Sequence, residues 1–497
     1  MAGDSPAEKA PVSSRSERRR RRLRKALLAL GVYTLASFLF SLIPGPVPTP
    51  TMARVRTDGW QSRAGLAGVG RADISPRQEL WADLNLFGEP SPIKGVAQPI
   101  KARALALGDE DGTPRVLIVS CELTFITRQL RDAVLEQLNR DGLDRVHLLL
   151  VATHTHAAPG NYWQGWVGER ICGSFSQEYF DYLVEGIVGA SRMAAANMEP
   201  VSVTVGTRST SHLVKHTTLV DPGTGRRAAV DNRLEVMALR RADGSLLAAL
   251  TSFPAHPLTL LHETDGQVAG DYPGELCRLI EAEHPSSVAL FLPGAVGGAR
   301  ATSPGGTDGY RGQPGKFGKV AKQADVLLEH VRDVLAIQGE PLGYVRCDTA
   351  MAALPRPDAH YFPEAGPYTG VRFLGAIPAW LANGVMDVLF LPDEAVFQVV
   401  VVNDTALLGV PGDLSNRIGL KLKRWVDAEH VWPLSHANGY DLGYVLDAEE
   451  YDQGGVVKGG YERLMDVFGK NSGAFTMRAL FELADHVGMR RVPGDLP

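Results

Sequence analysis

Two histidines one residue apart form the most specific chemical pattern in the sequence. His154 and His156 occur in the segment THTHAAPG, residues 153–160, directly after an apolar run. On an extended backbone, residues two positions apart face the same side, roughly 6.5 to 7 Å from each other, so both imidazoles would project together from the end of a strand. Neutral imidazole binds zinc, copper, iron and nickel. The pair therefore suggests a metal or catalytic site, whereas two surface histidines, or one packed and one solvated histidine, would give the same pattern.

Three further patterns supply candidate polar groups, and each pattern alone is weak evidence for a functional site. FPAHP places His256 at the end of a second apolar run, and GDYPG at 270–274 opens an expected helix. VPGD places Asp413 at a turn between a strand and a helix, where a helix N-cap is the ordinary role of aspartate. The segment NGYDLGYV contributes Tyr444 and the later GYE contributes Tyr461, although tyrosines beside glycines usually only pack against turns.

The elements that must hold these residues follow a mixed α/β pattern. Near-continuous apolar runs indicate strands covered on both faces, and apolar positions at helical spacing indicate helices. Strands are expected at 115–123, 146–153, 233–240, 246–253 and 287–292, with a single strand within 396–410; helices are expected at 127–138, 176–195, 274–283 and from about 415. Strands 233–240 and 246–253 should form a hairpin. The expected fold class is therefore α/β, with mixed sheets flanked by helices.

The composition is that of a globular chain, and its charge is divided unevenly. The sequence is 44% apolar and 22% charged, and its net charge of −5 is the balance of +6 in residues 1–25 and −11 in the remainder. An acidic body argues against nucleic acid as a partner, because phosphate binding needs a basic surface. The widely spaced Cys121, Cys172, Cys277 and Cys347 contain no CxxC pair, so we expect buried thiols in place of a disulfide framework.

The N-terminal region predicts a membrane anchor. Residues 26–43 carry no charge and follow the basic block, and an 18-residue helix just spans a hydrocarbon core of roughly 30 Å. The positive-inside rule keeps the N-terminus in the cytoplasm and exports the remainder to the periplasmic or extracellular side. A cleaved signal peptide and a buried core helix are alternatives, but the long basic region and the lack of an A-x-A site favour an anchor. We therefore expect a cytoplasmic tail at 1–25, a transmembrane signal anchor at 26–43, a Pro-rich stalk at 44–66 and a catalytic domain at 67–497.

Taken in order, the motifs resemble the neutral/alkaline (non-lysosomal) ceramidases. That order is THTH-A-P-G, F-x-x-H, G-D-Y-P-G, P-G-[E/D], G-Y-V and G-Y-E, and the segments GVGRADISP at 68–76 and GVAQPIKARALAL at 95–107 resemble the start of their catalytic domain. The resemblance covers about residues 68–465 and lies in motif order rather than in close sequence. It implies a divergent member represented by its catalytic domain only.

The resemblance also implies a zinc site. In that family one zinc is bound by two histidines, a glutamate and a tyrosine, and it activates the water that attacks an amide carbonyl. The ligands carried over to this sequence are His154, His256, Asp413 and Tyr444. Asp413 replaces the family's glutamate and shortens that ligand by one methylene.

Other family positions imply roles in proton transfer and substrate binding. His156 would support a ligand or act as the general acid and base, and Tyr461 would contact the amide oxygen. Lys215 lies near the place of a substrate-binding arginine in the family. Arg300 replaces a serine proposed as nucleophile or substrate contact, and Gly298 replaces an aspartate.

We therefore expect a membrane-anchored, zinc-dependent amidohydrolase that cleaves the N-acyl bond of ceramide or a related lipid amide. A hydrolase of another amide or ester with the same zinc site is one alternative, and a catalytically weakened lipid-binding homologue is another. The apolar segments 373–380 and 388–392 predict ordinary core or, alternatively, an acyl-chain groove or a membrane-facing lip. The expected partners are a lipid amide and the membrane, with no nucleic acid, and no oligomeric state is assigned.

Overall fold

The computed structural model describes residues 31, 50–54, 60–62, 64–89, 91–210, 212–216, 228–302, 309–313, 315–355, 357, 391–452 and 461–489. The predicted tail and anchor lie outside these residues except for Gly31, as does the apolar segment 373–380. In the described part of the chain, no helix has both the length and the apolar character needed to cross a membrane. Two short strands within the predicted stalk, β1 (Met52–Arg54) and β2 (Trp60–Ser62), pair with the second sheet described below.

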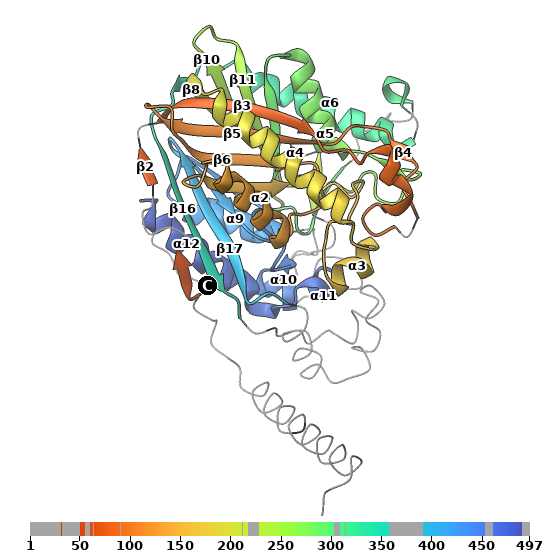
Figure 1. Ribbon diagram of the computed structural model, residues 1–497. Coiled ribbons are helices and arrows are strands. Elements are labelled where there is room, and N and C mark those ends of the chain that lie inside the picture. The colour runs from red at the N-terminus through yellow and green to blue at the C-terminus, as the bar shows by residue number, and fades with distance from the viewer. Residues whose placement is uncertain are drawn as a thin grey trace, which may run out of the picture.

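Two β-sheets pack face to face, and helices cover both outer faces (Figure 1). The first sheet has the strand order β13-β11-β10-β8-β3-β5-β6-β7, with β15 beside β8; the second has the order β1-β16-β17-β18-β20, with β2 beside β16. The first sheet consists of β3 (Ala64–Asp73), β5 (Lys101–Asp109), β6 (Pro114–Cys121), β7 (His147–Ala152), β8 (Glu199–Ser209), β10 (Arg233–Arg241), β11 (Leu246–Phe253), β13 (Val288–Pro293) and β15 (Glu340–Pro341). The remaining strands of the second are β16 (Val345–Ala353), β17 (Glu394–Val402), β18 (Thr405–Gly409) and β20 (His430–Leu434).

Alternation along the strands divides their side chains between two cores. On β6, Val116 and Ile118 face the second sheet, whereas Leu117 and Val119 face helices. From the second sheet, the fully buried Trp432 packs into the core between the sheets. Burial on both faces explains why β6 and β7 are near-continuous apolar runs in the sequence.

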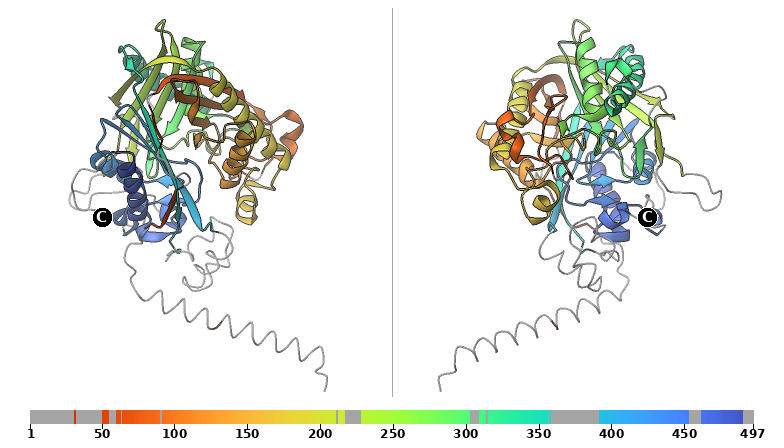
Figure 2. Two further views of the ribbon diagram at one scale, coloured as in Figure 1. Left: turned by 60° about the vertical axis from the view of Figure 1, so that its left-hand side comes forward. Right: turned by 90° about the vertical axis from the view of Figure 1, so that its right-hand side faces the viewer.

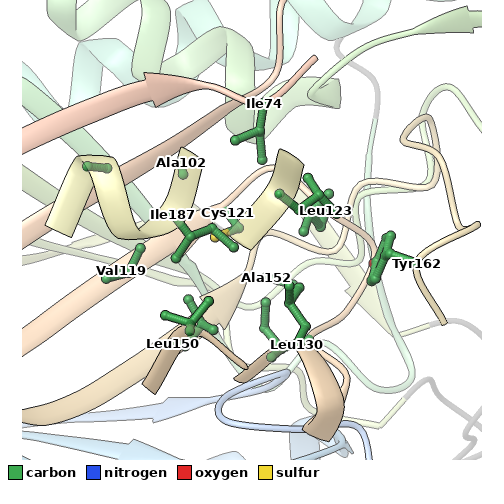
Figure 3. Close-up of a cluster of buried hydrophobic side chains, with 14 of the residues drawn as sticks. Ile74, Ala102, Val119, Cys121, Leu123, Leu130, Leu150, Ala152, Tyr162 and Ile187 are labelled. Carbon is green, nitrogen blue, oxygen red and sulfur yellow. The ribbon is translucent and has the colours of Figure 1, made fainter. Parts of the chain in front are cut away.

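Helices α2 (Arg128–Arg140) and α4 (Gln177–Ala196) cover one part of the first sheet. Figure 3 shows Leu130 of α2 and Ile187 of α4 in the same cluster as Val119 and Leu150 of the sheet. Helices α5 (Asp271–Glu283) and α6 (Gly315–Leu335) cover the part formed by β10, β11 and β13. Helices α9 (Asn416–Trp425) and α12 (Ser472–His486) cover the second sheet. In the left view of Figure 2, α4 (yellow) and α12 (dark blue) lie on opposite sides of the strands. The fold thus has four layers, in the order helix, sheet, sheet, helix.

Short helices and two-stranded ribbons complete the described fold. The ribbons pair β4 (Gly95–Val96) with β12 (Gln267–Val268), β9 (Val214–His216) with β14 (Ala299–Ala301), and β19 (Asp413–Leu414) with β21 (Tyr444–Val445). The short helices are α3 (Trp166–Cys172), α10 (Ala448–Asp452), α11 (Tyr461–Met465) and the 3₁₀ turns Gln78–Asp83, Tyr310–Gly312 and Gly469–Asn471. The β9–β14 and β19–β21 ribbons carry several of the predicted site residues.

The predicted α/β class is confirmed, and one predicted element is wrong. The single strand expected within 396–410 is two antiparallel strands, β17 and β18, which pair with each other. The chain turns at Asn403, whose φ of +48° lies in the left-handed region that asparagine tolerates. Two polar residues were thus enough for a tight turn inside an apolar run. The four cysteines are buried free thiols, as expected.

Gly70 allows β3 to pack closely against α4. A Cβ at Gly70 would overlap the carbonyl oxygen of Ala190 and approach the Met193 Cβ to 2.7 Å, whereas a Cβ at Gly189 on α4 would meet no atom within 4 Å. We expect Gly70→Ala to lower the free energy of unfolding by about 1–3 kcal/mol, because the added methyl group overpacks the contact between β3 and α4. Gly189→Ala should raise it by roughly 0.5–1 kcal/mol, because alanine is the better helix former. Urea unfolding followed by circular dichroism measures both; a Gly70→Ala midpoint at or above that of the wild type would contradict the close packing.

Candidate metal centre

The candidate site lies where strands of both sheets end. His154 follows the end of β7, His256 follows β11 and His436 follows β20. Three parallel pairs bring carboxyl ends together: β6 with β7, β11 with β13, and β18 with β20. Carboxyl ends of parallel strands are the usual place for a site in α/β folds.

Backbone hydrogen bonds join the loops that carry these histidines. The His154 amide donates to Leu123 O at 2.9 Å, and the His256 amide donates to Ala299 O at 2.9 Å. The carbonyl oxygen of His436 accepts from the Ala152 amide at 3.1 Å. The last bond ties the second sheet directly to the edge of the first, so the two sheets meet at the cluster.

Three imidazoles face one another through their Nε2 atoms. The Nε2 of His154 lies 2.7 Å from that of His256 and 3.3 Å from that of His156, and the Nε2 atoms of His156 and His256 lie 3.4 Å apart. The Nδ1 of His154 lies 2.6 Å from Thr124 O. Because a carbonyl only accepts, Nδ1 carries the proton, and the Nε2 lone pair points into the cluster.

Asp413 completes the cluster from the β19–β21 ribbon. Its Oδ2 lies 3.9 Å from the Nε2 of His154 and 3.9 Å from the Nδ1 of His256. Tyr444 lies opposite Asp413 in the ribbon and is also buried. The cap of α9 is the side chain of Ser415, which accepts from the Arg417 amide, so Asp413 is not needed as an N-cap.

The carboxyl group of Asp413 is buried with few polar contacts to offset the loss of water. Neither oxygen accepts a hydrogen bond of ordinary geometry from the described residues. Burial raises the pKa of Asp413 well above its ordinary value, the Tyr444 phenol lowers it, and Glu462 raises it further. Glu462 is itself buried, so a second buried carboxyl group lies near that of Asp413.

His436 is a member of the cluster that the sequence analysis missed. Its ring stacks on that of His154, with centroids 3.7 Å apart and planes at 16°. The residue is fully buried, its φ is +56°, and neither ring nitrogen has a hydrogen-bond partner among the described residues. A signal was present, because His436 directly follows an apolar strand just as His154 and His256 do.

Burial keeps the histidines neutral and therefore competent as ligands. Desolvation lowers the pKa of His154 from 6.5 to about 4 and lowers the pKa values of His156, His256 and His436 well below 6.5. The charge of Arg300 lowers those of His156 and His256 further. Metals bind the neutral imidazole, so no proton has to leave these rings at pH 7.

The cluster has the donors that a transition-metal ion requires. Tetrahedral bonds of 2.0–2.1 Å place two ligand nitrogens about 3.3 Å apart. The Nε2 of His156 lies 3.3 and 3.4 Å from those of His154 and His256, whereas the Nε2 atoms of His154 and His256 lie 2.7 Å apart and must separate slightly to bind one ion. Ligand atoms also lie within 4.8 Å of one another in two groups, one formed by His154, His156 and His256, and one formed by His154, Asp413 and His436. Buried nitrogens and oxygens without partners are costly unless an ion or water satisfies them, so the donor set fits a metal.

The GDYPG motif shapes the wall beside the cluster. A Cβ at Gly270 or Gly274 would come within 2.8 or 3.1 Å of the carboxylate of Glu122, which forms a buried ion pair with Arg103. Asp271, whose φ is +53°, accepts hydrogen bonds from the Leu260 and Tyr272 amides at 2.9 and 2.6 Å. Burial raises the pKa of Asp271 to about 6. The motif therefore seats two buried carboxyl groups and holds the loop after His256.

The other predicted residues lie at different distances from the cluster. Arg300 forms a parallel bridge with His256, and Lys215 lies opposite Arg300 in the β9–β14 ribbon. Tyr461 is the first residue of α11, and its side chain lies outside the described part of the structure. The structure thus brings together His154, His156, His256 and Asp413, with Tyr444 beside Asp413 and Arg300 beside His256.

Residues 66–307 match the family "Neutral/alkaline non-lysosomal ceramidase, N-terminal", and the structure agrees with this match. The crystal structure of the neutral ceramidase from Pseudomonas aeruginosa superposes with a TM-score of 0.71 at 18% identity, over 88% of this chain and 77% of that chain. The chain thus resembles this family over residues 66–307 and shares the fold of a neutral ceramidase.

Sequence relatives in the ceramidase family are distant and cover short stretches. The neutral ceramidase of P. aeruginosa is 25% identical over 204 residues, which are 39% of this chain and 30% of the relative. That of Mycobacterium tuberculosis is 30% identical over 146 residues, which are 28% of this chain and 22% of the relative. The chain thus aligns with less than a third of the length of these relatives. The family match ends before Asp413 and Tyr444, so these two rest on motif order and geometry.

We expect metal binding to release protons, because the Asp413 carboxyl must lose its proton before it can become a ligand. Calorimetric titration of the metal-free protein with Zn²⁺ near pH 7, in two buffers of different ionisation enthalpy, counts these protons. Asp413→Asn should release fewer protons than the wild type, because burial raises the pKa of this carboxyl. His330→Ala, which removes a histidine of α6 outside the cluster, is the control and should release as many as the wild type. Equal release together with unchanged zinc affinity in Asp413→Asn would exclude this carboxyl from the centre.

Proposed function

We propose that this protein is a zinc-dependent amide hydrolase that cleaves the N-acyl bond of ceramide or a related lipid amide. The observation that carries the proposal is the buried group of three Nε2 atoms with Asp413 beside it, in a chain that resembles the ceramidase family. The relatives named above are neutral ceramidases, which supports an amide substrate with a long acyl chain.

In this proposal His154, His256 and Asp413 hold the zinc, with Tyr444 beside them. Zinc bound there would act as a Lewis acid and lower the pKa of a bound water. The hydrogen bond from His154 Nδ1 to the Thr124 carbonyl fixes the ring orientation. The near-complete burial of these side chains keeps bulk water away and strengthens electrostatic interactions inside the site.

His156 is the proposed proton carrier. It is less buried than His154, its Nδ1 has no hydrogen-bond partner among the described residues, and the edge of Phe87 packs on its ring at 5.2 Å. Its pKa is lowered, so the ring is neutral at pH 7 and can accept a proton. Water adds to the amide carbonyl carbon, His156 takes its proton and passes it to the nitrogen, and the C–N bond breaks to give a fatty acid and an amine.

One observation favours a weaker alternative, a lipid-binding homologue with little catalysis. Asp413 replaces the longer glutamate of the family, and its nearest oxygen stays 3.9 Å from both imidazoles. A metal-loaded protein that binds lipid amides but hydrolyses neither amides nor esters would support that alternative. Ester hydrolysis alone would support the same site with a different substrate.

Ceramide hydrolysis by the purified, zinc-loaded protein tests the proposal directly. We expect fatty acid release that a chelator abolishes and added zinc restores. His256→Ala should lose about 100-fold or more in kcat/KM, because an incomplete ligand set holds the metal poorly. The His330→Ala control should stay close to the wild type. Zinc-loaded protein inactive on ceramides, other lipid amides and esters would overturn the enzyme assignment.

We also propose that the catalytic domain is anchored on the exported side of a membrane. The proposal rests on the uncharged run 26–43 after a basic block of residues. After cell lysis, the full chain should sediment with membranes and resist a carbonate wash, and removal of residues 1–43 should release it. Recovery of the full chain in the soluble periplasmic or medium fraction would favour a cleaved signal peptide instead.

A further inference from the structure

Two cations face each other on the ribbon beside the metal centre. Arg300 of β14 and Lys215 of β9 are direct partners in an antiparallel pair, and directly opposite residues project from the same face. Both are exposed, whereas Val214, His216 and Ala299 on the same strands are buried. The alternation therefore places both positive charges on the solvent-facing side of the ribbon.

This arrangement costs stability unless something negative offsets it. Like charges directly opposite each other in a sheet repel. Several other basic residues of the fold are paired with carboxylates: Lys423 lies 2.8 Å from Asp231 and 2.7 Å from Glu235, and Arg278 lies 2.6 Å from Glu275. In the described residues neither Arg300 nor Lys215 has a carboxylate partner. Two adjacent cations without carboxylate partners, on a body whose net charge is otherwise negative, can bind an anion.

The pair is also coupled to the catalytic cluster. Arg300 forms a parallel bridge with His256, whose amide donates to Ala299 O at 2.9 Å. A group bound by Arg300 would therefore lie next to the bond that the cluster would cleave.

We propose that Arg300 and Lys215 bind an anionic group of the substrate close to the scissile amide. The preferred substrates would then be lipid amides whose amine half carries a carboxylate or phosphate, such as N-acyl amino acids, rather than neutral ceramides. A guanidinium binds such oxygens with two parallel hydrogen bonds, and the lysine adds a second charge. This inference rests on the proposed function only for the reaction, since binding itself needs no hydrolysis.

Matched ligands separate anion recognition from acyl-chain binding. N-lauroylglycine, N-lauroylethanolamine and O-phospho-N-lauroylethanolamine share one acyl chain and differ in a carboxylate, a hydroxyl and a phosphate. Binding of each to the full chain in the presence of a chelator is measured by calorimetry below micelle-forming concentrations, and kcat/KM is measured with the zinc-loaded protein. We expect an anionic ligand to bind about tenfold tighter than the neutral one, as for a hydrogen bond to a charged group. The stronger of the two anions identifies the natural group.

Variants test whether these two side chains cause the preference for anionic ligands. Arg300→Gln should abolish this preference, and Lys215→Gln should reduce it. Arg424→Gln, which removes an exposed arginine of α9, should leave the preference unchanged. The preference should also weaken with added salt. Equal binding of all three ligands by the wild type, or a preference that survives Arg300→Gln, would overturn the inference.

The outcomes distinguish this inference from the proposed function. Hydrolysis of neutral and anionic amides at the same rate, unaffected by Arg300→Gln, would leave the hydrolase in place and remove the anion site. An Arg300-dependent preference in binding without hydrolysis of any amide would keep the anion site and remove the hydrolase.

Discussion

The crowding of four uncharged imidazoles and one carboxyl group in a dry interior is the constraint on which this structure depends. The Nε2 atoms of His154, His156 and His256 lie within 3.4 Å of one another, and His436 stacks on His154. Burial removes the charge from each histidine, and without charge the rings can approach one another. The surrounding fold must hold this unfavourable grouping in place, because polar groups buried without partners cost stability.

Strained backbone conformations occur at and beside this cluster of buried polar groups. His154, His436 and Asp271 have φ values of +68°, +56° and +53°, in the left-handed region that side chains with a Cβ rarely adopt. Such conformations persist where the surroundings determine them strongly, and they gather at functional sites. In this chain the surroundings are the backbone hydrogen bonds between strand ends, such as that from the Ala152 amide to His436 O.

The sequence predicted the parts of the site that follow from local patterns. His154 and His256 could be found because each follows an apolar strand, and the motif order brought in Asp413 and Tyr444. His436 follows a strand as well, but its strand HVWPL is short and none of the motifs quoted above contains it. The stacking on His154 arises from the meeting of two sheets, which no local pattern encodes. The same limit explains the missed turn at Asn403, where apolar residues on both sides concealed two strands.

The joining of the two sheets has a consequence for biosynthesis. Leu150 and Asn438, which hydrogen-bond beside the cluster, are 288 positions apart in the chain. Contacts this distant in sequence form late, because a long loop must close before they are made. During translation, most of the chain must emerge before the centre is complete. Metal uptake would thus be among the last events of maturation and would mark a chain whose two halves have docked correctly.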